Sequence, residues 1–330
     1  MDLPLGYDPH KKVSSKGEKL DLIYLLLRGL KGFLHSQFKL KDLGALKYFL
    51  GLETARSARG LFLSQHNYTL QLLDDSGFLA CKPTSSPMDP KVKLTSLEGD
   101  LLHDASSYRR LVGRLLYLTV SRLDITFAVH KLSQFVSSPR QPHLDAAHHL
   151  LRYLKASPGQ GLFYSAASDF QLRAFANADW GSYLDTRKSV TSFYIFIGDS
   201  MISWKAKKQT TISRSSAEAE YRALASTTSE LIWPYQFLND FQIHQSGPAA
   251  LFCDNQAAIH IATNPIFHER TKHIEIDCHF VRDKVTDGSI KLLPVRTHHQ
   301  LVDLFTKALL AKSLLPLLSK MVILDIHRPS

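Results

Sequence analysis

The order of the apolar segments between Gly161 and Leu310 constrains the fold of this chain more than any other feature. Three segments typical of strands come first, at residues 172–178, at 190–197, and from 201 towards 212. Later segments lie at 217–241, 249–253, 256–262, 274–285, 290–295 and 301–310, and all are helical in pattern except the strands 249–253 and 290–295. Three strands followed by alternating helices and strands predict an α/β domain.

A region with the apolar spacing of helices precedes this domain. Between residues 106 and 155, leucines recur three and four positions apart, as at Leu111, Leu115 and Leu118. Helices that bury one face have this spacing. Three prolines among serines at residues 83–90 mark a linker before it.

Composition narrows the class of protein. The 330 residues are 44% apolar and 21% charged, and 40 Lys and Arg exceed 30 Asp and Glu to give a net charge of +10. This charge favours polyanionic partners because each neutralised phosphate releases counterions, although ribosomal, membrane-surface and ordinary basic proteins share it. Three cysteines without C-x-x-C spacing argue against a disulfide framework and a standard zinc finger. No apolar run is long enough to predict a membrane span.

Two glutamates lie near the start of the helical segment 217–241. Ser215 and Glu218 have the spacing of a capping box, in which Glu218 returns to the Ser215 amide, and Glu218 can also pair with Arg222. Glu220 lies on the inward side, where an unpaired carboxylate is costly unless a metal ion or another cation meets it. We therefore expect Glu220, rather than Glu218, to be a metal ligand.

Two aspartates have both a functional and a local structural interpretation. Asp254 follows the strand 249–253, at the carboxyl end where open α/β sheets place ligands, but it can equally cap the following helix. Asp303 lies in the helical segment 301–310 and can either join an acidic site or form a salt bridge with Lys307. In the first strand, Asn177 and Asp179 point to the same face because side chains alternate.

Six short motifs follow one another through this region. They are ANADW (176–180), ISWKAKKQ (202–209), SSAEAEY (215–221), CDNQA (253–257), HERTKHI (268–274) and QLVDLFTK (300–307). In this order they resemble the ribonuclease H domain at the end of copia-type long-terminal-repeat retrotransposon polyproteins. The resemblance implies a ribonuclease H-like mixed sheet with flanking helices, over residues 161–310.

Upstream motifs extend the resemblance over most of the chain. They are FKLKDLG (38–44), YFLGL (48–52), and the segments 108–119 and 132–139. These resemble the part of the polyprotein between the polymerase palm and the nuclease. The resemblance implies that residues 33–157 form a smaller, mostly helical region like a reverse transcriptase thumb or connection, that residues 1–32 are a truncated palm remnant, and that residues 311–330 are a tail.

The resemblance also assigns a catalytic site and a reaction. In the family, acidic residues hold two Mg²⁺ or Mn²⁺ ions that cleave RNA in RNA–DNA hybrids, and the matching positions here are Asn177, Glu220, Asp254 and Asp303. Asn177 stands where the family has aspartate, so we expect a severe loss of cleavage. Asp179 lies on the same strand face and could partly substitute, but it lies nearly 7 Å further along the strand, at about 3.3 Å per residue, so we expect little rescue.

A second departure concerns the polymerase. The Tyr-Val-Asp-Asp metal motif of the family's palm is absent before Phe33, so we expect no DNA synthesis by this chain. Residues 1–7 nevertheless resemble an earlier stretch of the palm, and the region near Leu20 is interpreted as a deletion joint or a mispredicted splice.

Basic and histidine residues complete the candidate sites. Candidate phosphate contacts flank Trp204 or lie in the motif 268–274, and a solvated strand edge is the alternative for the first group; they are Lys205, Lys207, Lys208, Arg214, Arg270 and Lys272. A histidine and cysteine group can be considered for zinc, but its spacing matches no standard site and a basic surface fits better; it consists of His268, His273, Cys278 and His279. His298 and His299 are either aids to proton transfer near Asp303 or plain loop residues.

The leading hypothesis is a retrotransposon polyprotein fragment whose partner is an RNA–DNA hybrid, with no small-molecule substrate and no membrane. By resemblance, its place is intracellular, in cytoplasmic virus-like particles or in the nucleus. Two alternatives remain: a catalytically silent nucleic-acid-binding or structural remnant, and a protein-interaction module adopted by the host. Nothing in the sequence fixes the oligomeric state.

Overall fold

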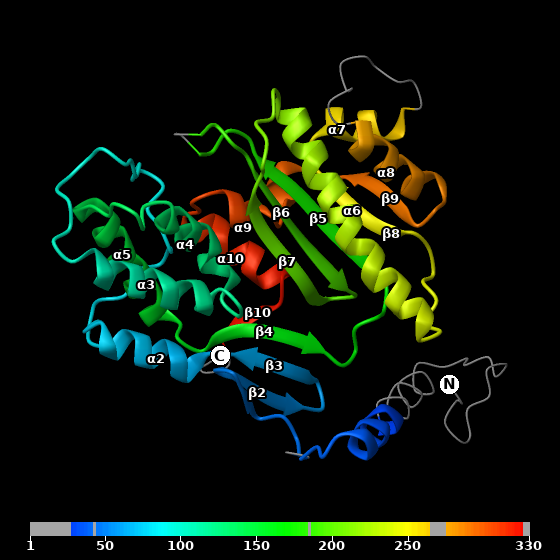
Figure 1. Cartoon of the computed structure of the whole chain (residues 1–330), viewed down its shortest axis with the longest axis horizontal. Helices are drawn as coiled ribbons and strands as arrows, with labels where there is room; N and C mark the ends of the chain where they lie inside the picture. The colour runs from blue at the N-terminus through cyan, green and yellow to red at the C-terminus, as the bar shows by residue number, and fades with distance from the viewer. Residues whose placement is uncertain (1–27, 42–43, 184–185, 265–274, 326–330) are drawn as a thin grey trace.

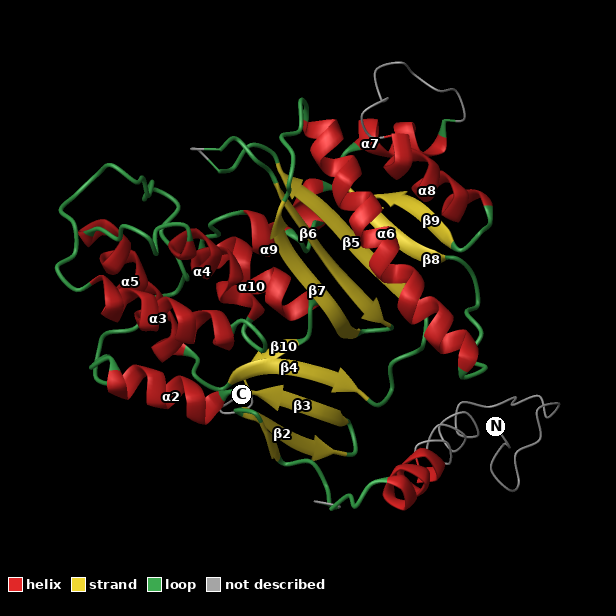
Figure 2. Cartoon of the chain, in the orientation of Figure 1, coloured by secondary structure: helices red, strands yellow, loops and turns green. Residues whose placement is uncertain are grey.

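The computed structural model describes residues 28–41, 44–183, 186–264 and 275–325. They form two five-stranded sheets with helices packed on and between them (Figures 1 and 2). Within these ranges, no helix combines the length and the apolar character needed to cross a bilayer. The expected palm remnant at residues 1–32 lies almost wholly outside the described residues.

The first sheet is antiparallel throughout and draws its strands from both ends of the chain. Its order is β1-β2-β3-β4-β10, formed by Tyr48–Phe49, Leu52–Ser57, Gly60–Ser64, Gln160–Ser165 and Ile323–Asp325. In the β4–β10 pair, Leu162 lies opposite Ile323. The sequence patterns did not predict this sheet, because all five of its strands have six or fewer residues and several of its pairing strands are far apart in the chain.

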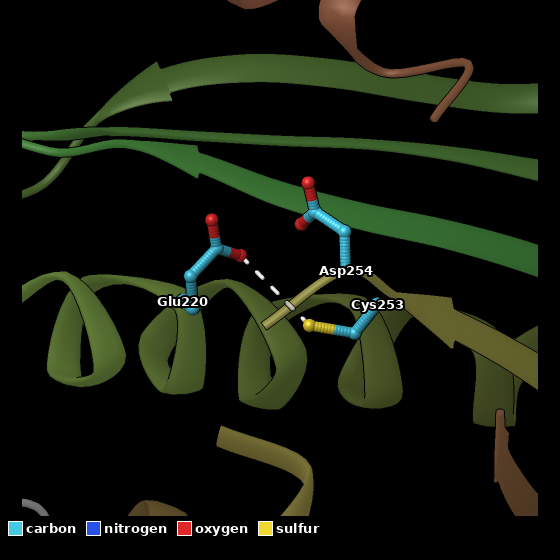
Figure 3. Close-up of side chains that lie close together, drawn as sticks. All are labelled: Glu220, Cys253 and Asp254. Carbon is cyan, nitrogen blue, oxygen red and sulfur yellow. Dashed lines mark hydrogen bonds between the residues drawn. The ribbon is translucent and has the colours of Figure 1, made fainter. Parts of the chain in front are cut away.

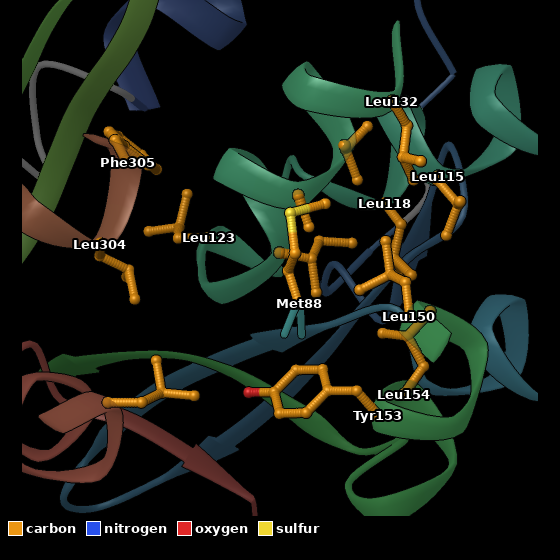
Figure 4. Close-up of a cluster of buried hydrophobic side chains, with 14 of the residues drawn as sticks. Met88, Leu115, Leu118, Leu123, Leu132, Leu150, Tyr153, Leu154, Leu304 and Phe305 are labelled. Atoms are coloured by element: carbon orange, nitrogen blue, oxygen red, sulfur yellow. The ribbon is translucent and has the colours of Figure 1, made fainter. Parts of the chain in front are cut away.

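Helices predicted in the region 106–155 are present. They are α3 (Ala105–Leu118), α4 (Thr126–Ser133) and α5 (Gln141–Ala156), with α2 (His66–Asp75) before them. Their leucines build a core with Met88, Tyr153, Leu304 and Phe305 (Figure 4). Since Leu304 and Phe305 belong to this core, the first part of the chain packs directly against the later motif 300–307.

The second sheet is mixed, in agreement with the expected α/β domain. Its order is β7-β6-β5-β8-β9, formed by Ser200–Lys208, Val190–Ile197, Leu172–Asp179, Ala249–Cys253 and Ile290–Pro294. β5, β6 and β7 are antiparallel neighbours, whereas β8 and β9 run parallel to β5. A second core lies between one face of this sheet and the helices α6 (Ser216–Asp240), α7 (Gln256–Thr263) and α8 (Glu275–Thr286).

The helix predicted at 301–310 is wrong in length. Only α9 (Asp303–Thr306) is α-helical, after the 3₁₀ turn η3 (Thr297–His299), and the chain is extended at Lys307. Every residue from Leu301 to Thr306 is buried, so this turn is enclosed on all sides instead of burying one helical face. The third strand also ends earlier than predicted, at Lys208, one position before the Gln209 amide donates to the Ser189 carbonyl.

Residues 311–325 are part of the first sheet and its core rather than a tail outside both domains. They form α10 (Ala311–Lys320) and β10, and Leu314, Leu317 and Leu318 are buried. β4 likewise pairs with β3 and β10 rather than with the second sheet. The second domain therefore begins after β4, and not at residue 161.

A buried ion pair joins the end of α3 to the end of α5. The guanidinium of Arg122 donates to both carboxylate oxygens of Asp124, at 3.0 and 2.8 Å, and to the Ser157 carbonyl at 2.7 Å. Tyr153 donates to the same carboxylate at 2.6 Å. Both charged side chains are fully buried, so each depends on the other for its stability.

We predict that Asp124→Asn lowers the free energy of unfolding by about 3–5 kcal/mol, because it leaves the Arg122 charge buried without a counter-ion. The matched control is Asp75→Asn, which breaks the exposed 2.8 Å pair with Arg114 and should cost at most about 1 kcal/mol. Urea denaturation of the three proteins measures both effects. Equal losses for the two variants would contradict the assignment of Arg122–Asp124 as a stabilising core pair.

Candidate functional site

The candidate site lies where parallel strands β5 and β8 end beside the first turns of α6. Phe175 of β5 pairs with Phe252 of β8, so Asn177 and Asp254 lie at the same edge of the sheet. Parallel strands bring the residues at their carboxyl ends together, which is where α/β sheets usually bind ligands. The expected convergence of β5, α6 and β8 is therefore present.

Glu220 points from α6 towards Asp254 and Cys253 (Figure 3). One ligand atom of each of these three residues lies within 4.8 Å of the others, and the Cys253 thiol is 4.0 Å from Oε2 of Glu220. Burial raises the pKa of Glu220 to about 8, with the charges of Asp254 and Asp303 adding to the shift, while the Ala178 amide and Lys307 oppose it. Without a cation, Glu220 is therefore mostly protonated at neutral pH.

Glu218 has the local structural role expected of it. Its backbone amide donates to the Ser215 hydroxyl at 3.2 Å, and its carboxylate pairs with Arg222 at 3.1 Å. The return hydrogen bond of the capping box comes from the Arg214 amide at 2.8 Å, instead of the expected Ser215 amide. Glu218 is thus engaged at the helix start, which leaves Glu220 as the glutamate of the site.

Asp254 does not cap the helix that follows it. The cap of α7 is Asn255, whose side chain accepts from the Ala258 amide at 3.0 Å. The Asp254 carboxylate lies beside Glu220 instead (Figure 3). Of the two interpretations left open by the sequence, the structure favours the one that places Asp254 in the site.

Asp303 contacts both Asn177 and Lys307. The Asn177 side-chain amide donates to Oδ1 of Asp303 at 2.9 Å, and Lys307 Nζ lies 2.9 Å from Oδ2. Burial raises the pKa of Asp303, and the charge of Asp254 adds to this, whereas Lys307 and Asn177 lower it. The salt bridge expected as an alternative is present. Asp303 is not among the residues whose ligand atoms come together with Glu220 and Asp254, although its charge acts on Glu220. Gln300 holds the turn against β5 by donating to the Ala176 carbonyl at 3.0 Å.

Asp179 is not among the residues whose ligand atoms come together with Glu220 and Asp254. It lines a small cavity of about 40 Å³ with Lys131, Tyr183 and Lys208 among its walls. Burial raises its pKa and the charge of Asp303 adds to this, while Ser182 and the charges of Lys131 and Lys307 lower it. Lys131 comes from α4, in the first part of the chain, and no motif in the sequence pointed to it.

The expected basic group around Trp204 does not form one surface. Lys205 packs over the Phe193 ring at 6.0 Å, on the α6 face of the sheet, whereas Lys208 lies 3.9 Å from the Tyr183 ring on the opposite face. Lys207 and Arg214 are exposed, and Trp204 packs against the first core. Strand alternation accounts for the split. Arg270 and Lys272 lie outside the described residues.

The histidine and cysteine residues considered for zinc also separate. Cys278 is fully buried in the second core and His279 is exposed, while His268 and His273 lie outside the described residues. Among the described residues, the one group of potential metal ligands that comes together is Glu220, Cys253 and Asp254. His298 and His299 are exposed in η3.

The donor set fits a hard divalent cation in part. Carboxylate oxygens of Glu220, Asp254 and Asp303 are suitable ligands for Mg²⁺ or Mn²⁺. Burial and the Glu220 charge raise the pKa of the Cys253 thiol, so it stays protonated and is a poor ligand. The sequence could have placed Cys253 here, because it ends β8 on the same side as the buried Leu251 that faces α6.

Comparisons with known proteins cover most of the chain. A family model described as reverse transcriptase (RNA-dependent DNA polymerase) matches residues 22–90. The retrovirus-related Pol polyprotein from transposon RE1 of Arabidopsis thaliana is 41% identical over 284 residues, which are 86% of this chain and 19% of that protein. The chain thus spans about a fifth of that relative's length.

Two further likenesses differ in weight. The uncharacterized mitochondrial protein AtMg00810 of Arabidopsis thaliana is 43% identical over 200 residues, which are 61% of this chain and 83% of that protein. The solved N-terminal RNase H domain of rv2228c from Mycobacterium tuberculosis, a fusion with maltose-binding protein, is 12% identical with a TM-score of 0.30, covering 45% of this chain and 98% of that one. A likeness of that degree has no weight for the fold.

We predict that, in metal-free buffer, Glu220→Gln increases the free energy of unfolding relative to the native chain, and that this increase grows as pH rises. The folded pKa of Glu220 is about 8 and its ordinary value is 4.5, so the folded state holds the extra proton between these values and loses stability as pH increases through this window. Glutamine removes that loss. The difference in unfolding free energy between variant and native chain should grow by up to about 1.4 kcal/mol per pH unit.

Urea denaturation at pH 5, 6, 7 and 8 with a chelator present measures this difference. The matched control is Glu230→Gln on the same helix, which removes an exposed carboxylate that accepts a hydrogen bond from Ser203. A flat profile for both variants would show that Glu220 is not buried as a protonated acid.

Proposed function

The chain belongs to the copia-type retrotransposon Pol polyproteins, and from this premise we propose that its second sheet carries a ribonuclease H-like domain whose metal-dependent cleavage of RNA in RNA–DNA hybrids is impaired by Asn177. The observation that carries the proposal is the hydrogen bond of 2.9 Å from the Asn177 amide to Asp303, whose charge acts on Glu220. It pairs a neutral donor with one of the acids expected in the site.

The arrangement of the acids supports a hydrolytic site. Glu220, Asp254 and Asp303 come from α6, the end of β8 and α9; the charges of Asp254 and Asp303 act on Glu220, and that of Asp254 acts on Asp303. Buried carboxylates that repel one another are costly unless cations are bound between them. These three residues would hold Mg²⁺ or Mn²⁺, and a bound pair of such ions stabilises both the attacking and the leaving oxygen at a phosphodiester.

Asn177 opposes this arrangement in either orientation of its amide. As placed, Nδ2 faces Asp303 and offers a hydrogen that repels a cation. If the amide turned over, its carbonyl oxygen would face the Asp303 carboxylate without a hydrogen bond and would still lack the negative charge of aspartate. The cluster is therefore one negative charge short, and Asp303 is held by the amide and by Lys307.

Asp179 is a poor replacement for the missing acid. Its surroundings are Ser182 and Lys131, in a cavity walled by α4 and β6, with the charges of Lys307 and Asp303 also acting on it, and it is not grouped with Glu220 and Asp254. We expect it to contribute little to cleavage.

Contact with the hybrid would rest on exposed cations near this edge of the sheet. Lys207 and Arg214 are exposed, and Lys205 keeps its charged end exposed above Phe193. Cations of this kind grip the phosphate backbone without reading sequence. Lys208 lies on the opposite face over Tyr183 and would belong to a separate contact.

A silent nucleic-acid-binding remnant is the second candidate function. The same contacts favour it, because Asn177 and Lys307 satisfy Asp303 without any metal ion. The two candidates differ in one respect. An impaired nuclease regains cleavage when the missing charge is restored, whereas a remnant whose site has decayed further does not.

We predict that Asn177→Asp raises magnesium-dependent cleavage of a labelled RNA–DNA hybrid by at least about a hundredfold over the native chain, the scale on which single charged or polar groups matter in catalytic sites. Adding Asp254→Asn to that variant should abolish the gain. The matched control is Asn67→Asp, which adds the same charge at the exposed start of α2 and should change nothing.

Each outcome of this assay has a distinct meaning. Cleavage by the native chain that Asp254→Asn abolishes would show that Asn177 does not impair the site. Silence of Asn177→Asp, with folding intact, would remove the nuclease proposal and leave the binding remnant.

A further inference from the structure

A cavity of about 570 Å³ opens on the face of the second sheet that lies opposite α6. Its walls come from β5, β6, β8 and β9, from η3 and from the end of α10. None of Glu220, Asp254 and Asp303 lines it. Its volume is within the range of about 300–1,000 Å³ that is usual for small-ligand sites.

The floor of the cavity is aromatic. Phe175 and Phe252 are stacked with their ring centres 4.7 Å apart and an interplanar angle of 18°, and Phe196 meets Phe175 edge-on at 6.0 Å. Phe175 and Phe252 are only partly buried, so an edge or face of each ring remains open to the cavity. A flat apolar surface of this kind suits the ring of a nucleobase, since stacking tolerates any base.

The rim of the cavity is cationic. Arg296, His299 and Lys320 line one side, and Lys320 Nζ lies 2.7 Å from Nδ1 of His299. Partial desolvation and the positive charges of Lys320, His298 and Arg296 lower the pKa of His299. Among the described residues, neither Arg296 nor Lys320 has a carboxylate partner within salt-bridge distance. The positive charges on this side of the rim are therefore not balanced by a carboxylate among the described residues.

The opposite side of the rim is already neutralised. Arg173 pairs with Asp199 at 2.7 Å and also donates to the Gly198 carbonyl. Among the described residues, Asp199 is the one carboxylate that lines the cavity, and it can accept a hydrogen bond from an amino or hydroxyl group. The cavity thus offers an anion-binding side, an aromatic floor and a hydrogen-bond acceptor.

We propose that this cavity binds a nucleoside monophosphate unit, with its phosphate at Arg296, His299 and Lys320 and its base against Phe175 and Phe252. The ribose or the base edge then faces Asp199. An inorganic anion would leave the aromatic floor uncovered, and an apolar ligand would leave the cations unpaired, so neither matches both halves of the site. The unit is either a free mononucleotide or the unpaired end of a strand, since both present the same chemistry.

The site is close to the acidic cluster but does not depend on it. Phe175 lies two residues before Asn177 on the same face of β5, about 7 Å away along the strand, and Leu301 lies two residues before Asp303. Binding here involves no metal ligand. The inference therefore goes beyond the proposed nuclease function and holds whether or not the chain cleaves a hybrid.

Calorimetric titration of the full chain with AMP, in the presence of a chelator, tests the proposal. Parallel titrations use adenosine, which lacks the phosphate, and ribose 5-phosphate, which lacks the base. Arg296→Ala and Lys320→Ala remove cations of the rim, and Lys312→Ala removes an exposed lysine of the same helix α10 that does not line the cavity. Thermal melting verifies that each variant is folded.

We expect AMP to bind, and both truncated ligands to bind at least about fivefold more weakly, as the loss of one stacked base or one charge-assisted contact implies. Arg296→Ala and Lys320→Ala should each weaken AMP by about tenfold, and Lys312→Ala should leave it unchanged. A short single-stranded RNA that binds more tightly than AMP identifies a strand end as the source, and equal or weaker binding identifies a free nucleotide. Absence of AMP binding at millimolar concentration, ribose 5-phosphate as tight as AMP, or rim variants without effect would each overturn the proposal.

Discussion

The hydrogen bond from Asn177 to Asp303 is the contact on which the state of the acidic cluster depends. It joins β5 to α9 across 126 positions of the chain and, together with Lys307, satisfies the carboxylate of Asp303, a residue that is 8% exposed. An aspartate at 177 would instead set two buried negative charges against each other, which is tolerable only with a cation between them. Because the Asn177 amide is neutral and donates a hydrogen bond, Asp303 can stay buried without a bound metal ion.

The position of Asp303 in turn depends on the first part of the chain. Leu304 and Phe305, which follow it directly, are buried in the core built by α3, α4 and α5. The ring centres of Phe305 and Tyr194 of β6 lie 4.4 Å apart. α10 and β10 close the same core from the other end of the chain. The site thus depends on both parts of the chain, because Asp303 is positioned by the neighbouring Leu304 and Phe305, which are buried in the first core.

Sequence periodicity predicted where the strands of the second sheet lie and which glutamate belongs to the site. Apolar alternation placed its strands to within a few residues, and the inward face of a helix singled out Glu220 from Glu218. The pairing of Asn177 with Asp303, the short α9 and the β4–β10 pair were not predictable in the same way. Each of them depends on which distant segments pair and in what register. The local spacing of residues does not determine either.

The central claim is that one neutral side chain has weakened a metal site whose other ligands remain in place. Calorimetric titration with Mn²⁺ of the native chain and of Asn177→Asp tests it most directly, since it measures the ions themselves and not the reaction. We predict that the native chain binds Mn²⁺ at least about tenfold more weakly than the variant, because the charge of the ligand set controls affinity for hard cations. Equal affinity and equal stoichiometry in the two proteins would contradict the claim.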